Sequence, residues 1–340
     1  MRWRLKTMIQ SSKPTDSADK IVVRGIMNII KDQRIVLLVL IIAISIAVAT
    51  ANPRFLTIRN IITILQQISV LGLITLGTAM LMLSGGLDLS VGNIMILSGC
   101  TIAVLINQNP GNPSIVPIAV VLGITIATAA GALNGFIIAK SRCMPLIISL
   151  GMSGVYLGIA ILISGGNYMS FRLAFEPLRA MRIAGIMPIN MIIFLFMVFV
   201  CFVLVNHTKF GRRIVAIGGN EQNARLSGIN VDAHKIMTYA ISGLLCGIAS
   251  ILYASRLDSI TASGGSGYEL NALTASIIGG VTFDGGKGSV LGAFLGVIFM
   301  GLVANAMNVL GIGSALQTVI SGVIVVMAVI ISNINNIRKK

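Results

Sequence analysis

Charged residues are missing from two long parts of this sequence. No Asp, Glu, Lys or Arg occurs between Asp88 and Lys140, and none occurs between Lys287 and Arg338. About 20 consecutive apolar residues are enough to cross the hydrocarbon core of a bilayer as a helix. Uncharged stretches of this length therefore exclude an ordinary soluble protein, and they predict a chain that crosses a membrane several times.

Residues that build disulfides, metal sites and nucleotide sites are also scarce. The four cysteines stand singly without a C-x-x-C pair, and the two histidines belong to no metal-like cluster. The Walker A loop, which cradles ATP phosphates, has the pattern G-x-x-x-x-G-K followed by Ser or Thr. Around Lys287 the first position is Val281 and the last is Gly288, so this pattern fails twice. We expect no metal, nucleotide or other cofactor on this chain, and no enzymatic activity.

Apolar side chains, in contrast, are abundant. Of the 340 residues, 56% are hydrophobic and 10% are charged, with a net charge of +15. The Lys and Arg residues gather at the ends of apolar segments rather than along one face, which indicates topology signals and not a nucleic-acid surface. We predict a basic cytoplasmic tail (1–34), a single transmembrane domain (35–332) and a short cytoplasmic C-terminal tail (333–340).

Ten apolar segments follow one another along the chain, separated by charges or by clusters of Gly, Pro and Asn. The eighth is the shortest of them, so it is expected to tilt, break or share its crossing with the next. The segments cover residues 35–51, 61–83, 91–107, 115–139, 145–163, 188–206, 236–255, 270–283, 289–310 and 314–332. This pattern predicts an all-α, polytopic bundle of about ten transmembrane helices.

The distribution of basic residues predicts the orientation of these spans. With the N-terminus in the cytoplasm, the inside segments hold 19 Lys and Arg residues and the outside segments hold six. Such a bias is what the positive-inside rule describes, so both termini are predicted to be cytoplasmic. Spans two to five and spans seven to ten then run in opposite directions, as the inverted halves of a pseudo-twofold transporter do.

The segment Gly85-Gly86-Leu87-Asp88-Leu89-Ser90-Val91-Gly92 joins the second and third spans and holds the only acid between Asp32 and Glu176. A carboxylate beside membrane-depth backbone is costly unless donors satisfy it, and the glycines allow a close turn. Two interpretations follow. Either this is a tight turn in which Asp88 or Ser90 caps the third span, or Asp88 contacts the substrate directly.

The loop from His207 to Lys235 is the one long polar segment on the cytoplasmic side, and it contains a predicted short helix. Asn220 is a suitable N-cap, Glu221 lies in the first turn, and Gly228 can end the helix in the left-handed conformation. A free-standing helix of about two turns is marginal in water, which indicates that it docks on something. The alternative is a solvated loop whose cations only fix the topology.

Two further sets of polar residues are candidates for binding. Arginines before spans six and eight form a basic outer rim that either pairs with carboxylates of a docking protein or anchors against lipid headgroups. Uncharged polar groups inside the spans form a loose candidate pathway for a neutral solute, with interhelical hydrogen bonding as the alternative for each. The rim comprises Arg172, Arg179, Arg182 and Arg256, and the pathway set comprises Gln66, Gln67, Asn134, Asn271 and Thr274.

Three blocks of this sequence resemble, in the same order, the permease subunits of simple-sugar ABC importers of the ribose, xylose, arabinose and autoinducer type. The first is the 85–92 segment. The second extends from Thr208 to Ile229 and resembles the cytoplasmic loop by which those permeases hold their ATPase. The third comprises Gly267-Tyr268-Glu269-Leu270, Ile278-Gly279-Gly280 and Gly285-Gly286-Lys287-Gly288-Ser289. The similarity covers the chain from about residue 52 to its C-terminus.

The resemblance implies a type II importer permease that works by alternating access in a bacterial cytoplasmic membrane. Its partners would be an ABC ATPase with duplicated nucleotide-binding domains, a second permease copy, identical or paralogous, and a periplasmic or lipid-anchored sugar-binding protein. The coupling helix of that family corresponds to residues 220–228. The residues expected to serve ATPase coupling are Asn220, Glu221, Ala224, Arg225 and Gly228.

Function is accordingly predicted to be import of a monosaccharide or a similar small sugar, driven by ATP that a separate chain hydrolyses. The alternative is a stand-alone secondary transporter that uses an ion gradient through Asp88. Such a transporter needs a proton or sodium site within the membrane, and Asp88 is the only acid plausibly placed for one. Uptake that persists without an ATPase subunit would favour this alternative.

Overall fold

The computed structural model describes residues 33–183 and 185–337 of the chain. The predicted basic tail therefore lies outside the described residues over positions 1–32, and the last three residues of the predicted C-terminal tail lie outside them too. In the described part, thirteen α-helices account for most of the chain, and the strands are two residues long. The prediction of an all-α, polytopic bundle is confirmed.

Within residues 33–183 and 185–337, eight helices are long and apolar enough to cross a membrane. They are α2 (Gln33–Ala51), α3 (Ile58–Leu83), α4 (Val91–Gln108), α5 (Ile115–Ser141), α6 (Pro145–Ser164), α8 (Ile189–His207), α11 (Val231–Leu257) and α13 (Val290–Val309). Each coincides with a predicted span to within a few residues. The two other predicted spans correspond to α12 (Tyr268–Ile278) and α14 (Ser314–Ile337). With 11 residues and a rise of about 1.5 Å per residue, α12 is too short to cross a bilayer alone.

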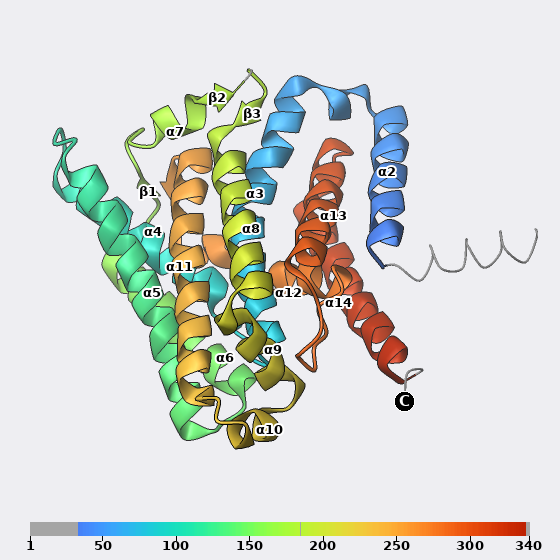
Figure 1. Cartoon of the computed structure of the whole chain (residues 1–340). Coiled ribbons are helices and arrows are strands. Elements are labelled where there is room, and N and C mark those ends of the chain that lie inside the picture. Colours follow the sequence, from blue (N-terminus) through green and yellow to red (C-terminus); the bar gives the residue numbers. More distant parts are fainter. Residues whose placement is uncertain (1–32, 184, 338–340) are drawn as a thin grey trace, which may run out of the picture.

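Short elements gather at the two ends of the bundle (Figure 1). At one end, β1 (Met169–Ser170) pairs antiparallel with β4 (Ser259–Ile260), and β2 (Arg182–Ile183) pairs antiparallel with β3 (Met187–Pro188). The helix α7 (Glu176–Ala180) and the 3-10 turn η1 (Pro53–Leu56) lie at this end as well. The helices α9 (Lys209–Gly219) and α10 (Glu221–Leu226) lie at the opposite end. A second 3-10 turn, η2 (Ala262–Gly265), precedes α12.

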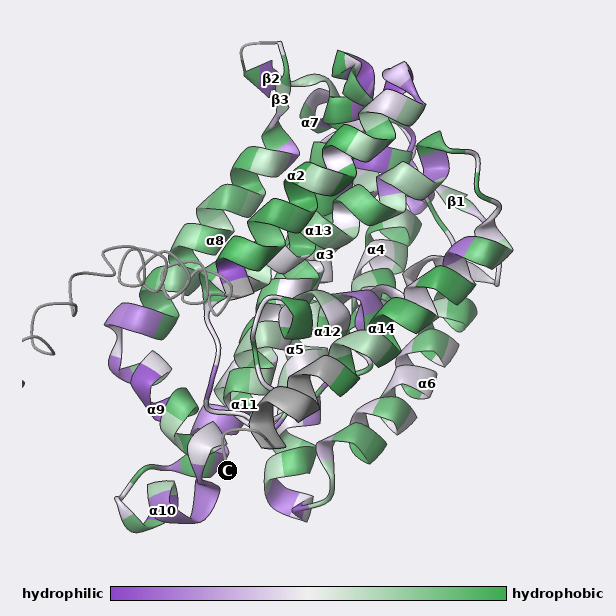
Figure 2. Ribbon diagram, turned by 90° about the vertical axis from the view of Figure 1, so that its right-hand side faces the viewer, coloured by the Kyte–Doolittle hydropathy of each residue, from purple (hydrophilic) through white to green (hydrophobic). Residues whose placement is uncertain are grey.

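The most enclosed helices are α3, α4 and α11, whereas α2 and α6 direct most of their side chains outward. Figure 2 shows that the outward faces of the long helices are predominantly hydrophobic and that hydrophilic residues concentrate at α9, α10 and the opposite end. An apolar exterior between two polar ends is the arrangement that a bilayer requires. The ends that carry α10 and α7 are therefore expected on opposite sides of the membrane.

The helices α5 and α11 approach each other at backbone distance because glycines lie where they cross. A Cβ added to Gly131 would lie 2.3 Å from the carbonyl oxygen of Tyr239, and one added to Gly243 would lie 2.3 Å from that of Ala127. Without a hydrophobic driving force in lipid, such close approach supplies the packing attraction between helices. The packed pair of α5 and α11 thereby forms a fixed support for the segments at the end that carries α10.

Candidate functional site

The 85–92 segment turns the chain sharply after α3 and then leads it back into the bundle. Gly85 adopts the left-handed conformation with φ of 73°, and the backbone N–H of Gly86 donates to the carbonyl oxygen of Leu81. Gly92 lies in the first turn of α4, where a Cβ would stand 2.4 Å from the carbonyl oxygen of Gly265 in η2. The left-handed φ of Gly85 and the close backbone approach at Gly92 thus favour glycine at the two ends of this segment.

Asp88 is buried inside this segment, with 2% of its surface exposed. Its Oδ1 accepts hydrogen bonds from the backbone N–H of Ser90 (2.7 Å) and from the Ser90 hydroxyl (2.5 Å). Its Oδ2 accepts one from the side-chain amide of Asn134 (3.1 Å). Within the described residues these three donors, rather than a cation, satisfy the carboxylate. A buried anion held by neutral donors is a rigid local support.

The network continues from Asn134 to Tyr156 on α6. The Tyr156 hydroxyl lies 2.8 Å from Asn134 Oδ1 and 2.9 Å from the carbonyl oxygen of Ala130, and its single proton serves one of them at a time. A second tyrosine, Tyr239 on α11, donates its hydroxyl proton to the carbonyl oxygen of Leu87 (2.8 Å). Both tyrosines were missed in the sequence, where neither stands near the acid. Together they tie the 85–92 segment to α5, α6 and α11.

The prediction that Asp88 or Ser90 caps the third span is wrong in its detail. Ser90 occupies the N-cap position of α4, but neither its side chain nor that of Asp88 accepts a hydrogen bond from the first turn of the helix. The physical reason is competition, because the Ser90 hydroxyl donates to Asp88 and accepts from the Asn134 amide (2.8 Å). The prediction of a tight turn is confirmed, and the aspartate stabilises the turn rather than the helix.

The polar loop from His207 to Lys235 contains the predicted helix and one more. As predicted, Asn220 caps α10 by accepting from the backbone N–H of Asn223 (2.8 Å), and Gly228 follows it with φ of 78°. The second helix, α9, was not predicted, although Phe210, Ile214 and Ile217 recur at helical spacing within it. Its N-cap is Thr208, whose hydroxyl oxygen accepts from the backbone N–H of Gly211.

The charged residues of α10 turn toward α11 and toward each other. Glu221 pairs with Lys235 (2.6 Å) and with Arg225 (3.1 Å), and Arg225 also pairs with Asp232 (2.6 Å). Burial alone would raise the pKa of Glu221, but hydrogen bonds from Lys235 and Arg225 outweigh it and hold that pKa below its ordinary value. Lys140, at the end of α5, lies 4.0 Å from Asp232 and extends the network. These ion pairs hold α10 against the packed helices α5 and α11.

An apolar contact lies on the inner side of α10. Ala224 is buried against Ile217 of α9 and Val231 of α11. The small side chain of Ala224 lets the three elements approach. The outer side is different, because Leu226 is 80% exposed at the end of the molecule where polar residues predominate. Beside α10, a cleft is lined by Arg142, Glu221, Gln222 and Arg225.

The four arginines of the predicted outer rim have distinct surroundings. Arg172 donates from Nε to Oδ1 of Asn107 (2.8 Å), and Arg179 pairs with Glu176 (2.6 Å). Arg182 is exposed in β2, and Arg256 is half-buried in the last turn of α11. The first three thus lie at the end opposite α10, as expected for residues on the other side of the membrane. Their role in docking stays a prediction.

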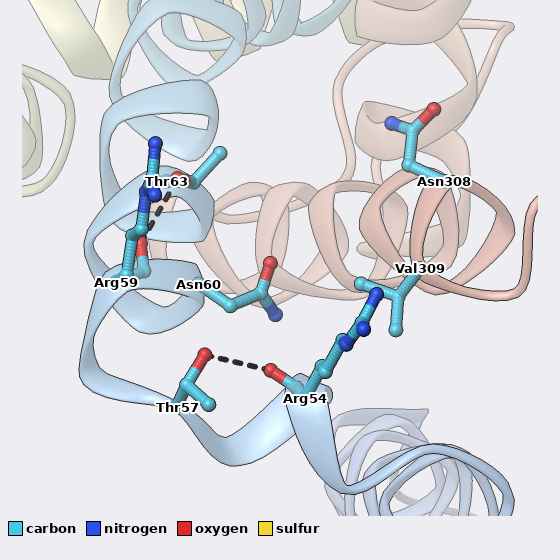
Figure 3. Close-up of a pocket in the computed structure, with 7 residues that line it drawn as sticks. All are labelled: Arg54, Thr57, Arg59, Asn60, Thr63, Asn308 and Val309. Carbon is cyan, nitrogen blue, oxygen red and sulfur yellow. Dashed lines mark hydrogen bonds between the residues drawn. The ribbon is translucent and has the colours of Figure 1, made fainter.

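A polar cleft that the sequence did not indicate lies where η1, α3 and α13 meet (Figure 3). Arg54 reaches across it toward Val309. On α3, Asn60, Thr63 and the predicted pathway residue Gln67 follow at spacings of three and four, which places them on one helix face. The remaining lining residues are Thr57, Arg59 and Asn308.

The predicted pathway residues have different surroundings, and their role in binding a solute stays a prediction. Gln66 and Gln67 are half-buried on α3, and Asn271 is half-buried on α12. Thr274 is buried and donates to the carbonyl oxygen of Leu270, while Asn134 belongs to the network around Asp88. A reciprocal amide pair between Asn60 and Asn305 (2.9 Å in both directions) was not predicted, because the two residues are 245 positions apart.

Comparison with known proteins gives a consistent result. Residues 60–329 match the family described as branched-chain amino acid transport system / permease component. The ribose import permease protein of Escherichia coli (strain K12) is 33% identical over 313 residues, 90% of this chain and 94% of that protein. The ribose import permease protein of Bacillus subtilis (strain 168) is 36% identical over 298 residues, 87% of this chain and 90% of that protein. The galactose/methyl galactoside import permease protein of Escherichia coli (strain K12) is 35% identical over 308 residues, 85% of this chain and 90% of that protein. No solved structure matches this chain.

Proposed function

This chain belongs to the family of branched-chain amino acid transport system permease components, and we propose that within it the chain imports a monosaccharide or a similar small sugar. Like its relatives, which are import permeases, it is a transport subunit and not an enzyme. The observation that carries the proposal is similarity over 85–90% of the chain to permeases whose names specify ribose, allose and galactose import. All three named solutes are neutral, hydroxyl-rich sugars of one size class.

The polar groups of the bundle fit a neutral, hydroxyl-rich solute. The cleft of Figure 3 presents guanidinium, amide and hydroxyl groups, and the same face of α3 carries Gln67 one turn further into the bundle. Amide and hydroxyl groups bind sugar hydroxyls weakly enough to release them, which a transport pathway requires. The alternative, an ion gradient acting through Asp88, has no support among the relatives. The three hydrogen bonds that Asp88 accepts from its own chain also occupy the carboxylate.

Energy is proposed to come from a separate ABC ATPase that docks on α10. The side chains of Glu221 and Arg225 are held by α11 and by each other, so they orient α10 rather than present free charges to the partner. Apart from Arg225, the exposed residues of α10 are Gln222, Asn223 and Leu226. Leu226 is a large apolar side chain in a polar setting, which is typical of an anchor residue that a partner's groove receives.

The further assembly follows from the membership of the family and from the charge bias. We place a second permease copy, identical or paralogous, beside this chain, and a periplasmic or lipid-anchored sugar-binding protein above the end that carries Arg172 and Arg179. Both termini are assigned to the cytoplasm of a bacterial cell, because 19 of the 25 Lys and Arg residues then lie inside. Changing Arg172, Arg179 and Arg182 to Glu tests the docking assignment, which predicts loss of ATP hydrolysis stimulated by the binding protein. Unchanged stimulation would contradict it.

The ATPase assignment is tested by Leu226→Ala in the assembled transporter. Truncation of an interface anchor costs about 1–2 kcal/mol, so the affinity for the ATPase subunit is expected to fall by roughly 5–30-fold. Met181→Ala is the matched control, because Met181 is an apolar side chain, 56% exposed, at the opposite end of the molecule. Co-purification and titration of the ATPase subunit onto the permease in nanodiscs measure the effect. If the two variants bound the ATPase subunit with equal affinity, the assignment of α10 to the interface would be wrong.

A further inference from the structure

Three Gly-Gly pairs from distant parts of the sequence meet at the cytoplasmic end of the bundle. One pair follows α3, the second ends α9 directly before α10, and the third lies in the turn between α12 and α13. We name their meeting point the glycine junction, which consists of Gly85, Gly86, Gly218, Gly219, Gly285 and Gly286. The first and third pairs occupy corresponding turns of the two oppositely oriented halves of the chain.

Gly218 is the centre of the junction. A Cβ at Gly218 would lie 2.1 Å from the carbonyl oxygen of Leu83 and 2.6 Å from the backbone nitrogen of Gly286. A Cβ at Gly285 would lie 2.8 Å from the carbonyl oxygen of Gly218 and 3.0 Å from the Cα of Gly85. A backbone hydrogen bond from Gly286 N–H to the Leu83 carbonyl oxygen (3.1 Å) joins the two halves directly. The end of α9 therefore touches both turns through backbone atoms alone.

The glycine junction connects three parts of the molecule. On the α9 side, Asn220 follows the junction immediately and caps α10, the helix proposed to contact the ATPase. On the α3 side, Leu87 and Asp88 follow Gly86 and are bonded to α11 and α5. On the third side the junction leads to α12 and α13.

The helices α12 and α13 are packed backbone against backbone, so we expect them to move together. A Cβ at Gly279 would stand 2.3 Å from the carbonyl oxygen of Gly292, and one at Gly296 would stand 2.0 Å from that of Ala275. Backbones this close cannot slide independently. A displacement delivered at Gly286 therefore moves both helices together.

We propose that Gly218 is a positioning residue for transport, at which motion of α10 enters both inverted halves of the permease at once. The proposal rests on the proposed function. Side chains at a contact absorb small displacements by changing rotamer, whereas a contact of backbone on backbone has no such freedom and transmits them. Packed contacts of this kind switch between discrete arrangements rather than deform continuously.

The test compares Gly218→Ala with Gly219→Ala in the complete transporter, reconstituted with its ATPase and binding protein in liposomes. Both positions lie in the last turn of α9, and neither has a left-handed φ. A Cβ at Gly219 would meet nothing within 4 Å, so this variant adds the same atom to the neighbouring junction residue without creating a new contact. We expect Gly218→Ala to bind the ATPase and hydrolyse ATP, but to import about tenfold less radiolabelled galactose or ribose per ATP, the factor that about 1.4 kcal/mol of overpacking produces.

A second variant keeps the proposal testable if Gly218→Ala fails to fold and insert into the membrane. Insertion of one Gly between Gly219 and Asn220 lengthens the link to α10 without adding a Cβ and leaves the Asn220 cap in place. It is expected to give the same loss of sugar imported per ATP with unchanged ATPase affinity. Wild-type coupling in either variant, or an equal loss in Gly219→Ala, would overturn the role of the junction. An ATPase that does not bind the unaltered chain would instead overturn the proposed function.

Discussion

Replacement of Asp88 distinguishes two roles for its carboxylate, a structural one and the carrying of an ion. Asp88→Ala removes the acceptor of the Ser90 backbone N–H and of the Ser90 hydroxyl, both of which are buried. Asp88→Asn keeps an oxygen for these two donors and changes only the atom that faces the Asn134 amide. The two variants therefore differ in how many buried donors they leave without a partner.

The expected magnitudes follow from that difference. Each stranded buried donor costs about 1–3 kcal/mol, so Asp88→Ala is expected to destabilise the bundle by about 2–6 kcal/mol. In Asp88→Asn the hydrogen bond from Asn134 is lost and the new side-chain amide faces it without an acceptor, at about 1–3 kcal/mol, while the desolvation cost of a buried charge is removed. The asparagine variant is therefore expected to stay close to the wild type in stability.

Thermal unfolding in detergent micelles, followed by size-exclusion chromatography, measures stability, and liposome uptake measures function. We expect a large fall in unfolding temperature for Asp88→Ala only, and ATP-dependent sugar uptake by Asp88→Asn. If Asp88→Asn folded normally but lost uptake altogether, the carboxylate would have a role in transport itself. If both variants were equally unstable, the hydrogen-bond account of the 85–92 segment would be wrong.

Two further predictions concern packing and pH. Gly131→Ala is expected to destabilise the bundle by about 1–3 kcal/mol because its Cβ would stand 2.3 Å from a backbone oxygen of α11. Gly158→Ala, whose Cβ meets nothing within 4 Å, is expected to be neutral or to gain up to about 1 kcal/mol, and thermal unfolding of the pair checks both values. The pKa of Glu221 is held below its ordinary value of 4.5 by Lys235 and Arg225, so its ion pairs stabilise α10 above that pH and are lost only as the pH falls through the lowered pKa. Hydrogen exchange of α10, corrected for intrinsic rates, is therefore expected to be flat from about pH 6 to pH 8, and a marked rise within this range would contradict the assignment.

The sequence predicted the helices well because their signals are local. Apolar length marks each span, and the cap at Asn220 and the left-handed Gly228 mark the ends of α10 within a few residues. The helix α9 was missed although its apolar spacing is regular, because glycine and arginine near it are typical of loops. Its pattern of Phe210, Ile214 and Ile217 was the signal that could have revealed it.

Contacts between distant segments could not be predicted from one sequence. Tyr156 and Tyr239 approach the 85–92 segment from helices that no local pattern relates to it. The glycine junction joins residues about 200 positions apart, such as Gly85 and Gly285. The cap predicted at Asp88 or Ser90 failed because the Ser90 hydroxyl bonds to Asp88 and to the amide of Asn134, which lies 44 positions away.

The central claim is that this chain is a passive gate whose energy arrives from a separate ATPase through α10. Accumulation of radiolabelled ribose or galactose by liposomes tests it most directly. The permease with its ATPase, binding protein and ATP is expected to accumulate sugar against a gradient. The permease alone is expected to accumulate none, even with an imposed proton or sodium gradient. Uphill accumulation by the permease alone would contradict the claim.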